Sequence, residues 1–151
     1  ISERRTDRIL DPDRSGGLPP FLAAEPGLNS GYMLAQYTAA ALVAENRVLS
    51  HPASVESIPT SGLQEDHVSM GWGAGRKLLD VITNTERVLA VELLCAAQGM
   101  EYRAPLQPAA ATAAALATIR EFVPPLTDDR PIGADIEAVA ELITTGGFEA
   151  G

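Results

Sequence analysis

The residues best suited to chemistry lie in the stretch SIPTSGLQEDHVSMGWG, which covers residues 57–73. Glu65 is a candidate general acid or base, because the apolar neighbours Leu63 and Trp72 would desolvate its carboxylate and raise its proton affinity. His67, one of two histidines in the chain, is a second candidate for the same role. The first hypothesis for this stretch is therefore acid–base catalysis.

Other kinds of site find less support in the sequence. His51 and His67 are far apart along the chain and no HExxH pattern is present, so we expect no metal site. Neither Ser61 nor Ser69 lies in a G-x-S-x-G nucleophile elbow. Cys95, the only cysteine, lies in the apolar run VELLCAA without a neighbouring cation that would stabilise a thiolate. We expect it to be a buried, unreactive thiol.

A purely structural role for the same stretch is the favoured interpretation when the residues are considered alone. Gln64, Glu65 and Asp66 are typical of a helix N-terminus, because the helix dipole favours negative charge in the first turn. Ser61 and Gln64 also have the spacing of a capping box. His67 would then be a solvated residue of the first helical turn.

A long helix is predicted to follow and to position this stretch. Apolar residues recur at alternating spacings of four and three, which is typical of a helix with a heptad-like seam. The seam consists of Val68, Trp72, Gly75, Leu79, Ile82, Glu86, Leu89, Leu93, Ala96 and Met100. A helix over 64–103, of about 40 residues, would span roughly 60 Å. Leu78, Val88 and Leu94 lie off the seam, so more than one face is apolar and the helix needs several neighbours.

The rest of the chain is predicted to contain shorter helices joined by loops. Residues 1–28 comprise a charged, helix-compatible lead-in and a loop rich in proline and glycine. A helix is predicted over 29–49, and a loop over 50–63 is long enough to be functional. Residues 104–151 contain the C-terminal helices. The apolar stripe predicted for the helix over 29–49 consists of Met33, Tyr37, Ala40, Ala41, Ala44 and Val48.

No segment shows the two-residue alternation of a half-buried strand, so the predicted class is all-α. We expect a long-helix bundle of four to five helices within a single segment over 1–151. Asp128, Asp129 and Arg130 are predicted to form a solvated turn.

Composition narrows the possible partners and location. The 151 residues are 46% hydrophobic, which is enough to form a core, and carry a net charge of −9. That charge repels phosphate backbones and anionic lipid surfaces, so we expect no nucleic acid and no membrane partner. The single cysteine and the absence of a signal peptide favour a cytoplasmic location. A charged segment begins directly at Ile1, and we expect the chain to be a fragment of a larger enzyme.

Three segments carry a specific resemblance: GLPPFL, PGLNSGYMLAQYTAAALVAEN and HPASVESIPTSGLQEDHVSMG. In order and without large gaps, they resemble the C-terminal half of the aromatic amino acid ammonia-lyases, over about Ser2 to Arg103. The Gln64-Glu65 pair resembles the pair found at this position in the histidine-specific branch of that family. Phenylalanine and tyrosine enzymes and the related aminomutases usually carry a glutamine where Glu65 stands.

The resemblance implies elimination of ammonia from L-histidine to give urocanate, in a homotetramer whose long helices form a central bundle. It also implies that Glu65 binds the substrate imidazole or transfers a proton, with Gln64 as its polar neighbour, in a site shared between subunits. Gly62 and Leu63 stand where the family usually has a small residue followed by Asn or Met. We therefore expect this loop to pack differently.

The family's cofactor, methylidene-imidazolone (MIO), arises from an internal Ala-Ser-Gly, which is absent from these residues. The near match at 60–62, Thr-Ser-Gly, aligns with the loop before QEDHV and not with the cofactor segment. The resemblance therefore implies that MIO and the family's tyrosine base belong to the N-terminal part of the same enzyme, and that this chain is inactive alone.

Two alternatives remain open. One is a non-catalytic helical oligomerisation or scaffold protein derived from the lyase fold, and the other is a lyase or aminomutase for another aromatic amino acid. In each case we expect self-association, because a long amphipathic helix leaves a large apolar area uncovered.

Overall fold

The computed structural model describes residues 1–55, 58–65 and 67–148. Within these ranges the chain is helical, which confirms the predicted all-α class. It forms five α-helices: α1 (Ser2–Leu10), α2 (Met33–Leu49), α3 (Gly71–Glu101), α4 (Ala110–Phe122) and α5 (Gly133–Thr144). Two short 3-10 turns, η1 (Pro20–Leu22) and η2 (Ser61–Leu63), lie in the connections.

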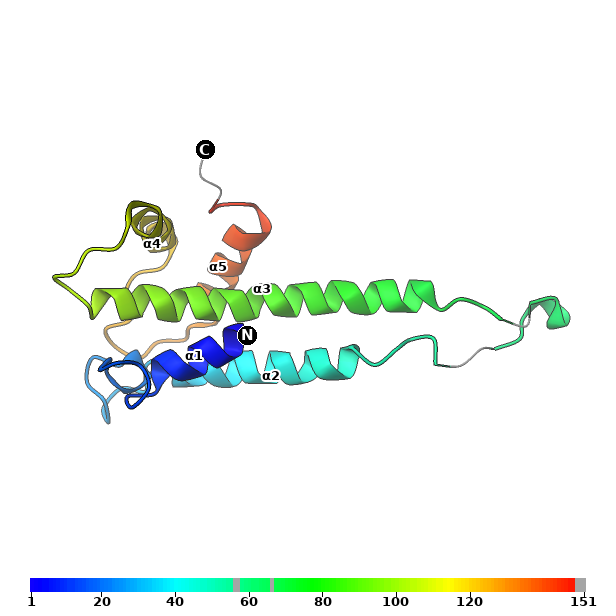
Figure 1. The fold of residues 1–151 in the computed structure, drawn as a ribbon, viewed down its shortest axis with the longest axis horizontal. Helices are drawn as coiled ribbons and strands as arrows, with labels where there is room; N and C mark the ends of the chain where they lie inside the picture. The colour runs from blue at the N-terminus through cyan, green and yellow to red at the C-terminus, as the bar shows by residue number, and fades with distance from the viewer. Residues whose placement is uncertain (56–57, 66, 149–151) are drawn as a thin grey trace.

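The long helix α3 organises the other four helices around itself. α2 runs antiparallel to α3 and α1 packs beside both, while α4 and α5 lie on the opposite side of α3 (Figure 1). None of the helices in the described part of the chain is long and apolar enough to cross a membrane.

α3 is shorter than the helix predicted over 64–103. It begins at Gly71, ends at Glu101 and has 31 residues, which corresponds to about 46 Å. The predicted capping box is wrong, because Ser61 adopts a left-handed φ of 51° within η2 and cannot cap a helix that starts ten positions later. Near the observed start, the Gly71 N–H donates to the Ser69 hydroxyl at 3.2 Å. The predicted first-turn residue Asp66 lies outside the described residues.

The core surrounds the C-terminal half of α3. All nine buried residues of α3 lie between Asn84 and Gly99. Val91 and Leu94 are fully buried in one apolar cluster with residues from α1, α2, α5 and the segment after α4. Full burial of such a side chain contributes about 1.5–3 kcal/mol, so this half of α3 carries much of the chain's hydrophobic stabilisation.

The heptad-like seam of α3 is not the face that the chain buries. No seam residue within the helix is fully buried, and the side chains of Trp72 and Leu79 are 84% and 65% exposed. The chain's own helices instead cover the second apolar face, which contains Val88, Val91 and Leu94. The spacing therefore identified two apolar faces, but it did not show which neighbour covers each.

α2 shows the same exchange of faces. It begins at Met33 rather than at residue 29, and it buries Ala35 and Ala39 against the core. Tyr37 and Val48, from the predicted apolar stripe, are 69% and 74% exposed. Leu42 and Val43 of the same helix are partly buried against this core.

The turn between α4 and α5 exposes Asp128 and Asp129, as predicted, and it is also tied to the start of α2. Asp129 accepts hydrogen bonds from the backbone N–H groups of Ser30 and Gly31 at 2.8 and 2.9 Å. The bond from Ser30 has the larger effect and the bond from Gly31 the next, and together they hold the pKa of Asp129 below its ordinary value. Arg130 donates to Asp135 in the first turn of α5 at 2.9 Å. Partners about a hundred residues apart leave no local signal in the sequence.

A buried amide fixes the same connection to α3. Gln98 donates from Nε2 to the Leu126 carbonyl at 3.2 Å, and its Oε1 accepts from the Leu126 N–H at 3.0 Å. Both residues are buried, so the pair satisfies two backbone groups that water does not reach. Arg103 near the end of α3 likewise donates to the carbonyls of Ser15 and Gly16. Loops at this end of the molecule are therefore held by specific hydrogen bonds.

Candidate functional site

The candidate residues lie in the connection from α2 to α3, beyond the ends of both helices (Figure 1). α2 ends at Leu49, and the His51-Pro52 pair follows, in agreement with the predicted end of the helix. Lys77 of α3 donates from its ammonium group to the His51 backbone carbonyl, which ties the end of α2 to the first turns of α3. The chain then leaves the helical body and forms the turn that carries Glu65.

This turn, residues 60–65, is closed by its own backbone. The Thr60 N–H donates to the Glu65 carbonyl at 2.9 Å, and the Glu65 N–H donates to the Thr60 carbonyl at 3.4 Å. Ser61, Gly62 and Leu63 between them have φ values of 51°, 62° and 70°. Left-handed backbone costs roughly 1–2 kcal/mol for each residue with a side chain, so this conformation is restrictive.

Glu65 is presented at the surface of this turn. Its Oε2 accepts a hydrogen bond from the Thr60 hydroxyl at 3.0 Å, while the residue as a whole is exposed. The expected desolvation by Leu63 and Trp72 does not occur within this chain, because these side chains are 76% and 84% exposed. Gln64 is also exposed, and its backbone N–H donates to the Ser61 carbonyl at 3.2 Å. Glu65 and Gln64 are therefore adjacent and accessible, as a shared site would require.

The other sequence candidates do not join Glu65 in a catalytic group. His51 and His67 are both exposed, and the described residues contain no cluster of three metal-ligating side chains. The Ser69 hydroxyl accepts a bond from the start of α3. Cys95 is fully buried, and this burial raises the pKa of its thiol, so it is a packing residue of the core.

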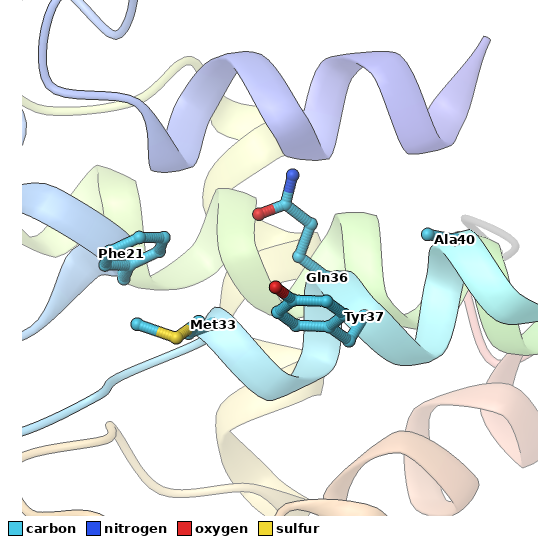
Figure 2. Close-up of a pocket in the computed structure, with 5 residues that line it drawn as sticks. All are labelled: Phe21, Met33, Gln36, Tyr37 and Ala40. Atoms are coloured by element: carbon cyan, nitrogen blue, oxygen red, sulfur yellow. The ribbon is translucent and has the colours of Figure 1, made fainter.

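A surface hollow of about 310 Å³ lies elsewhere, near the start of α2 (Figure 2). It is lined by Phe21, Met33, Gln36, Tyr37 and Ala40. The Gln36 side chain extends toward α1, where its Nε2 donates to Asp7 at 3.1 Å. The lining contains no carboxylate, imidazole or thiol, and its one titratable side chain is the exposed Tyr37.

Thr60 is the site residue that sequence reasoning missed. The capping-box spacing pointed to Ser61 as the hydroxyl of interest, because a helix was expected to begin there. In the structure the hydroxyl that reaches the candidate carboxylate is that of Thr60, five positions before Glu65. A tight turn flanked by proline and glycine was the available signal.

Comparison with known proteins defines the class. Residues 1–121 match the family model for aromatic amino acid lyases. A histidine ammonia-lyase of Natranaerobius thermophilus is 53% identical over 146 residues, covering 97% of this chain and 29% of the relative. The crystal structure of histidine ammonia-lyase from Trypanosoma cruzi superposes with a TM-score of 0.93 at 47% identity, over 97% of this chain and 29% of that one.

The match also extends to a branch with another activity. The crystal structure of tyrosine aminomutase from Streptomyces globisporus superposes with a TM-score of 0.90 at 43% identity, over 97% of this chain and 28% of that one. The all-helical fold is thus shared with solved structures of both kinds. The chain belongs to the aromatic amino acid lyase family, and it spans about 29% of the length of the curated relative it matches.

Proposed function

We propose that this chain is the C-terminal part of a histidine ammonia-lyase, which eliminates ammonia from L-histidine to give urocanate. The observation that carries the proposal is the 53% identity to a histidine ammonia-lyase over 97% of the chain. The Gln64-Glu65 pair, similar to the histidine-specific branch, lies accessible at the tip of the α2–α3 connection. Both observations favour histidine over the other aromatic amino acids.

In this proposal Glu65 accepts a hydrogen bond from the substrate imidazole or exchanges a proton with it. A carboxylate suits either role, since it accepts the imidazole N–H and stabilises the charged ring. Gln64, the next residue, has an amide that both donates and accepts. The turn at 60–65 places both residues beyond the helical body, where another part of the enzyme can complete the site.

The residues of this chain do not form the family's MIO cofactor. No Ala-Ser-Gly occurs in the sequence, and the near match at 60–62 forms the exposed turn with Thr60 paired to Glu65. We assign the cofactor and the tyrosine base to the N-terminal part of the parent enzyme. The 151-residue chain should therefore form no urocanate from L-histidine, and robust turnover by the isolated chain would contradict this.

Self-association of the parent enzyme, as a homotetramer, is part of the proposal. The support is the uncovered seam of α3, where Trp72 and Leu79 are more than half exposed, together with the neighbouring Leu78, which is also more than half exposed. Apolar side chains grouped on one helix commonly mark a protein–protein interface. A second copy of the same long helix would cover them, as in the bundle that the family resemblance implies.

Replacement of one carboxylate tests the proposed site. In the full-length protein we expect Glu65→Gln to lower kcat/KM for L-histidine by at least about a hundredfold, the lower range for loss of an acid–base group. Formation of urocanate, followed by its absorbance, measures this. Glu121→Gln, an exposed glutamate of α4, is the matched control and should retain full activity.

Two outcomes would change the proposal. Near-normal turnover of histidine by Glu65→Gln would remove Glu65 from the site. Preferential conversion of L-tyrosine or L-phenylalanine in a substrate panel would place the parent enzyme in another branch, such as that of the tyrosine aminomutase.

A further inference from the structure

We propose that Thr60 is a positioning residue for Glu65: its hydroxyl fixes the orientation of the carboxylate that the proposed reaction uses. This inference rests on the proposed function of Glu65. It is carried by the 3.0 Å hydrogen bond from Thr60 Oγ1 to Glu65 Oε2 and by the closed turn that joins the two residues.

The backbone brings the two side chains together. The paired hydrogen bonds between Thr60 and Glu65 form an isolated antiparallel bridge. Side chains of two directly opposed residues in such a pair lie close on the same face. The left-handed residues between them, at 61–63, shorten the connection so that the bridge closes over four intervening positions. The hydroxyl and the carboxylate are thus held in contact by the fold of the turn.

Threonine is well suited to this task. A glutamate side chain in an exposed turn has three rotatable bonds, and neither Leu63 nor Trp72 covers it within this chain. A β-branched residue such as Thr60 has few allowed χ1 orientations, so the direction of its hydroxyl is largely preset. A hydrogen bond to an ionised carboxylate is stronger than one between neutral groups. Thr60 therefore limits the carboxylate to orientations in which Oε2 faces the turn.

The hydrogen bond from Thr60 also decides which oxygen of the Glu65 carboxylate faces the substrate. With Oε2 held by Thr60, Oε1 is the oxygen presented to a substrate N–H. Thr60 does not itself need to touch the substrate, so its effect should pass through Glu65. Small displacements of a group that takes part in the reaction reduce the rate more than they reduce substrate binding.

The test compares two variants of the full-length protein. Thr60→Val keeps the β-branched shape and removes the hydroxyl, whereas Thr60→Ser keeps the hydroxyl and removes the methyl group. We expect Thr60→Val to lower kcat for L-histidine about tenfold, the scale of one hydrogen bond to a charged group, with little change in KM. Thr60→Ser should stay within about twofold of the wild type. Equal losses in the two variants, or wild-type activity of Thr60→Val, would overturn the proposal.

A double-mutant cycle shows whether the effect passes through Glu65. In the Glu65→Gln background, Thr60→Val should cause less than about a twofold further loss, because the two residues act as one unit. A full tenfold further loss would show that Thr60 acts independently and would contradict the inference. Melting temperatures of both Thr60 variants, expected to match the wild type, separate this effect from misfolding.

A crystal structure of the full-length Thr60→Val protein provides a readout that does not need activity. We expect the Glu65 carboxylate to leave its position beside residue 60 or to occupy several rotamers. An unchanged single conformation would contradict the inference. Failure of the proposed function differs from this: the wild-type protein would then not convert L-histidine, while the conformation of Glu65 would still depend on Thr60.

Discussion

The two halves of α3 belong to one continuous helix but have opposite environments. In the half from Asn84 onward, nine residues are buried. In the half from Gly71 to Thr83, no residue is buried, although Leu78, Leu79 and Ile82 are as apolar as the residues that follow. The halves therefore differ in their neighbours and not in their helical character.

This difference separates what the chain stabilises by itself from what it presents to others. The packed half supports α1, α2 and α5, and its end holds the loops through Gln98 and Arg103. The open half extends to the turn that carries Glu65 (Figure 1). The candidate site thus lies at the part of the molecule that its own core supports least.

The largest effect should come from matched leucines in the two halves. Leu94→Ala removes a fully buried side chain, and we expect it to lower the free energy of unfolding by about 2–5 kcal/mol. Leu79→Ala, at a site that is 65% exposed, should change it by less than about 0.5 kcal/mol. Urea unfolding of the 151-residue chain measures both. Equal losses would show that the halves are not different in the chain alone.

Leu79, which tolerates substitution in the chain alone, should become sensitive to substitution in the assembled enzyme. If copies of α3 cover the open half, Leu79→Asp in the full-length protein introduces a charge into an apolar contact and should reduce the assembled mass seen by light scattering. Wild-type assembly by this variant would locate the interface elsewhere.

A smaller effect is expected at the buried amide of the packed half. Gln98→Leu leaves the Leu126 N–H and carbonyl without their partners, and an unsatisfied buried group costs about 1–3 kcal/mol. Gln107→Leu is the matched control, because that exposed amide makes only a long contact of 3.4 Å to the Pro105 carbonyl. Thermal unfolding should separate the two variants clearly. A neutral Gln98→Leu would mean that the connection to α5 does not depend on this pair.

The smallest effect should be a change in the pH dependence of stability at Asp129. Hydrogen bonds from Ser30 and Gly31 hold its pKa below the ordinary value of 3.8 in the folded chain. The ionised form is thus favoured by folding, so its contribution is complete above 3.8 and is lost as the pH falls through the lower folded pKa.

Asp129→Asn should therefore lower the melting temperature at neutral pH and match the wild type more closely in acid. Asp128→Asn, the neighbouring acid, is the control and should show a smaller difference at neutral pH. A constant offset between wild type and Asp129→Asn at every pH would exclude the charge of Asp129 as the cause.

Much of the helical content was predictable because it depends on local pattern. The all-α class, the lead-in helix, the long helix and the stop at His51-Pro52 follow from periodicity and proline positions. The start of the long helix was wrong by seven positions, because the apolar spacing extends back to Val68 whereas α3 begins at Gly71. The spacing did not show which apolar face of α2 and of α3 this chain buries, because each helix has more than one apolar face.

Some features of the candidate site were likewise predictable from the sequence, and others were not. Glu65 and Gln64 remain predictions of function, and the structure adds that they share an exposed turn. The Asp129 tether joins residues about a hundred positions apart, so no local pattern indicated it. The Thr60 contact lies in a turn that its proline and glycine signalled, but the pairing with Glu65 depends on the left-handed residues at 61–63.

The sequence by itself determined the all-α class, that Cys95 is a thiol of the apolar core, and which residues are candidates for chemistry. Local propensity, hydrophobic periodicity and side-chain type are properties of neighbouring residues, and they need no knowledge of the fold. Only the tertiary structure decided which apolar face is covered, which hydroxyl meets the carboxylate and which acid holds the start of α2. The covered face and the Asp129 tether depend on contacts between residues distant in the chain, which form only once the helices have packed. The Thr60–Glu65 contact depends on the left-handed backbone of the turn between the two residues.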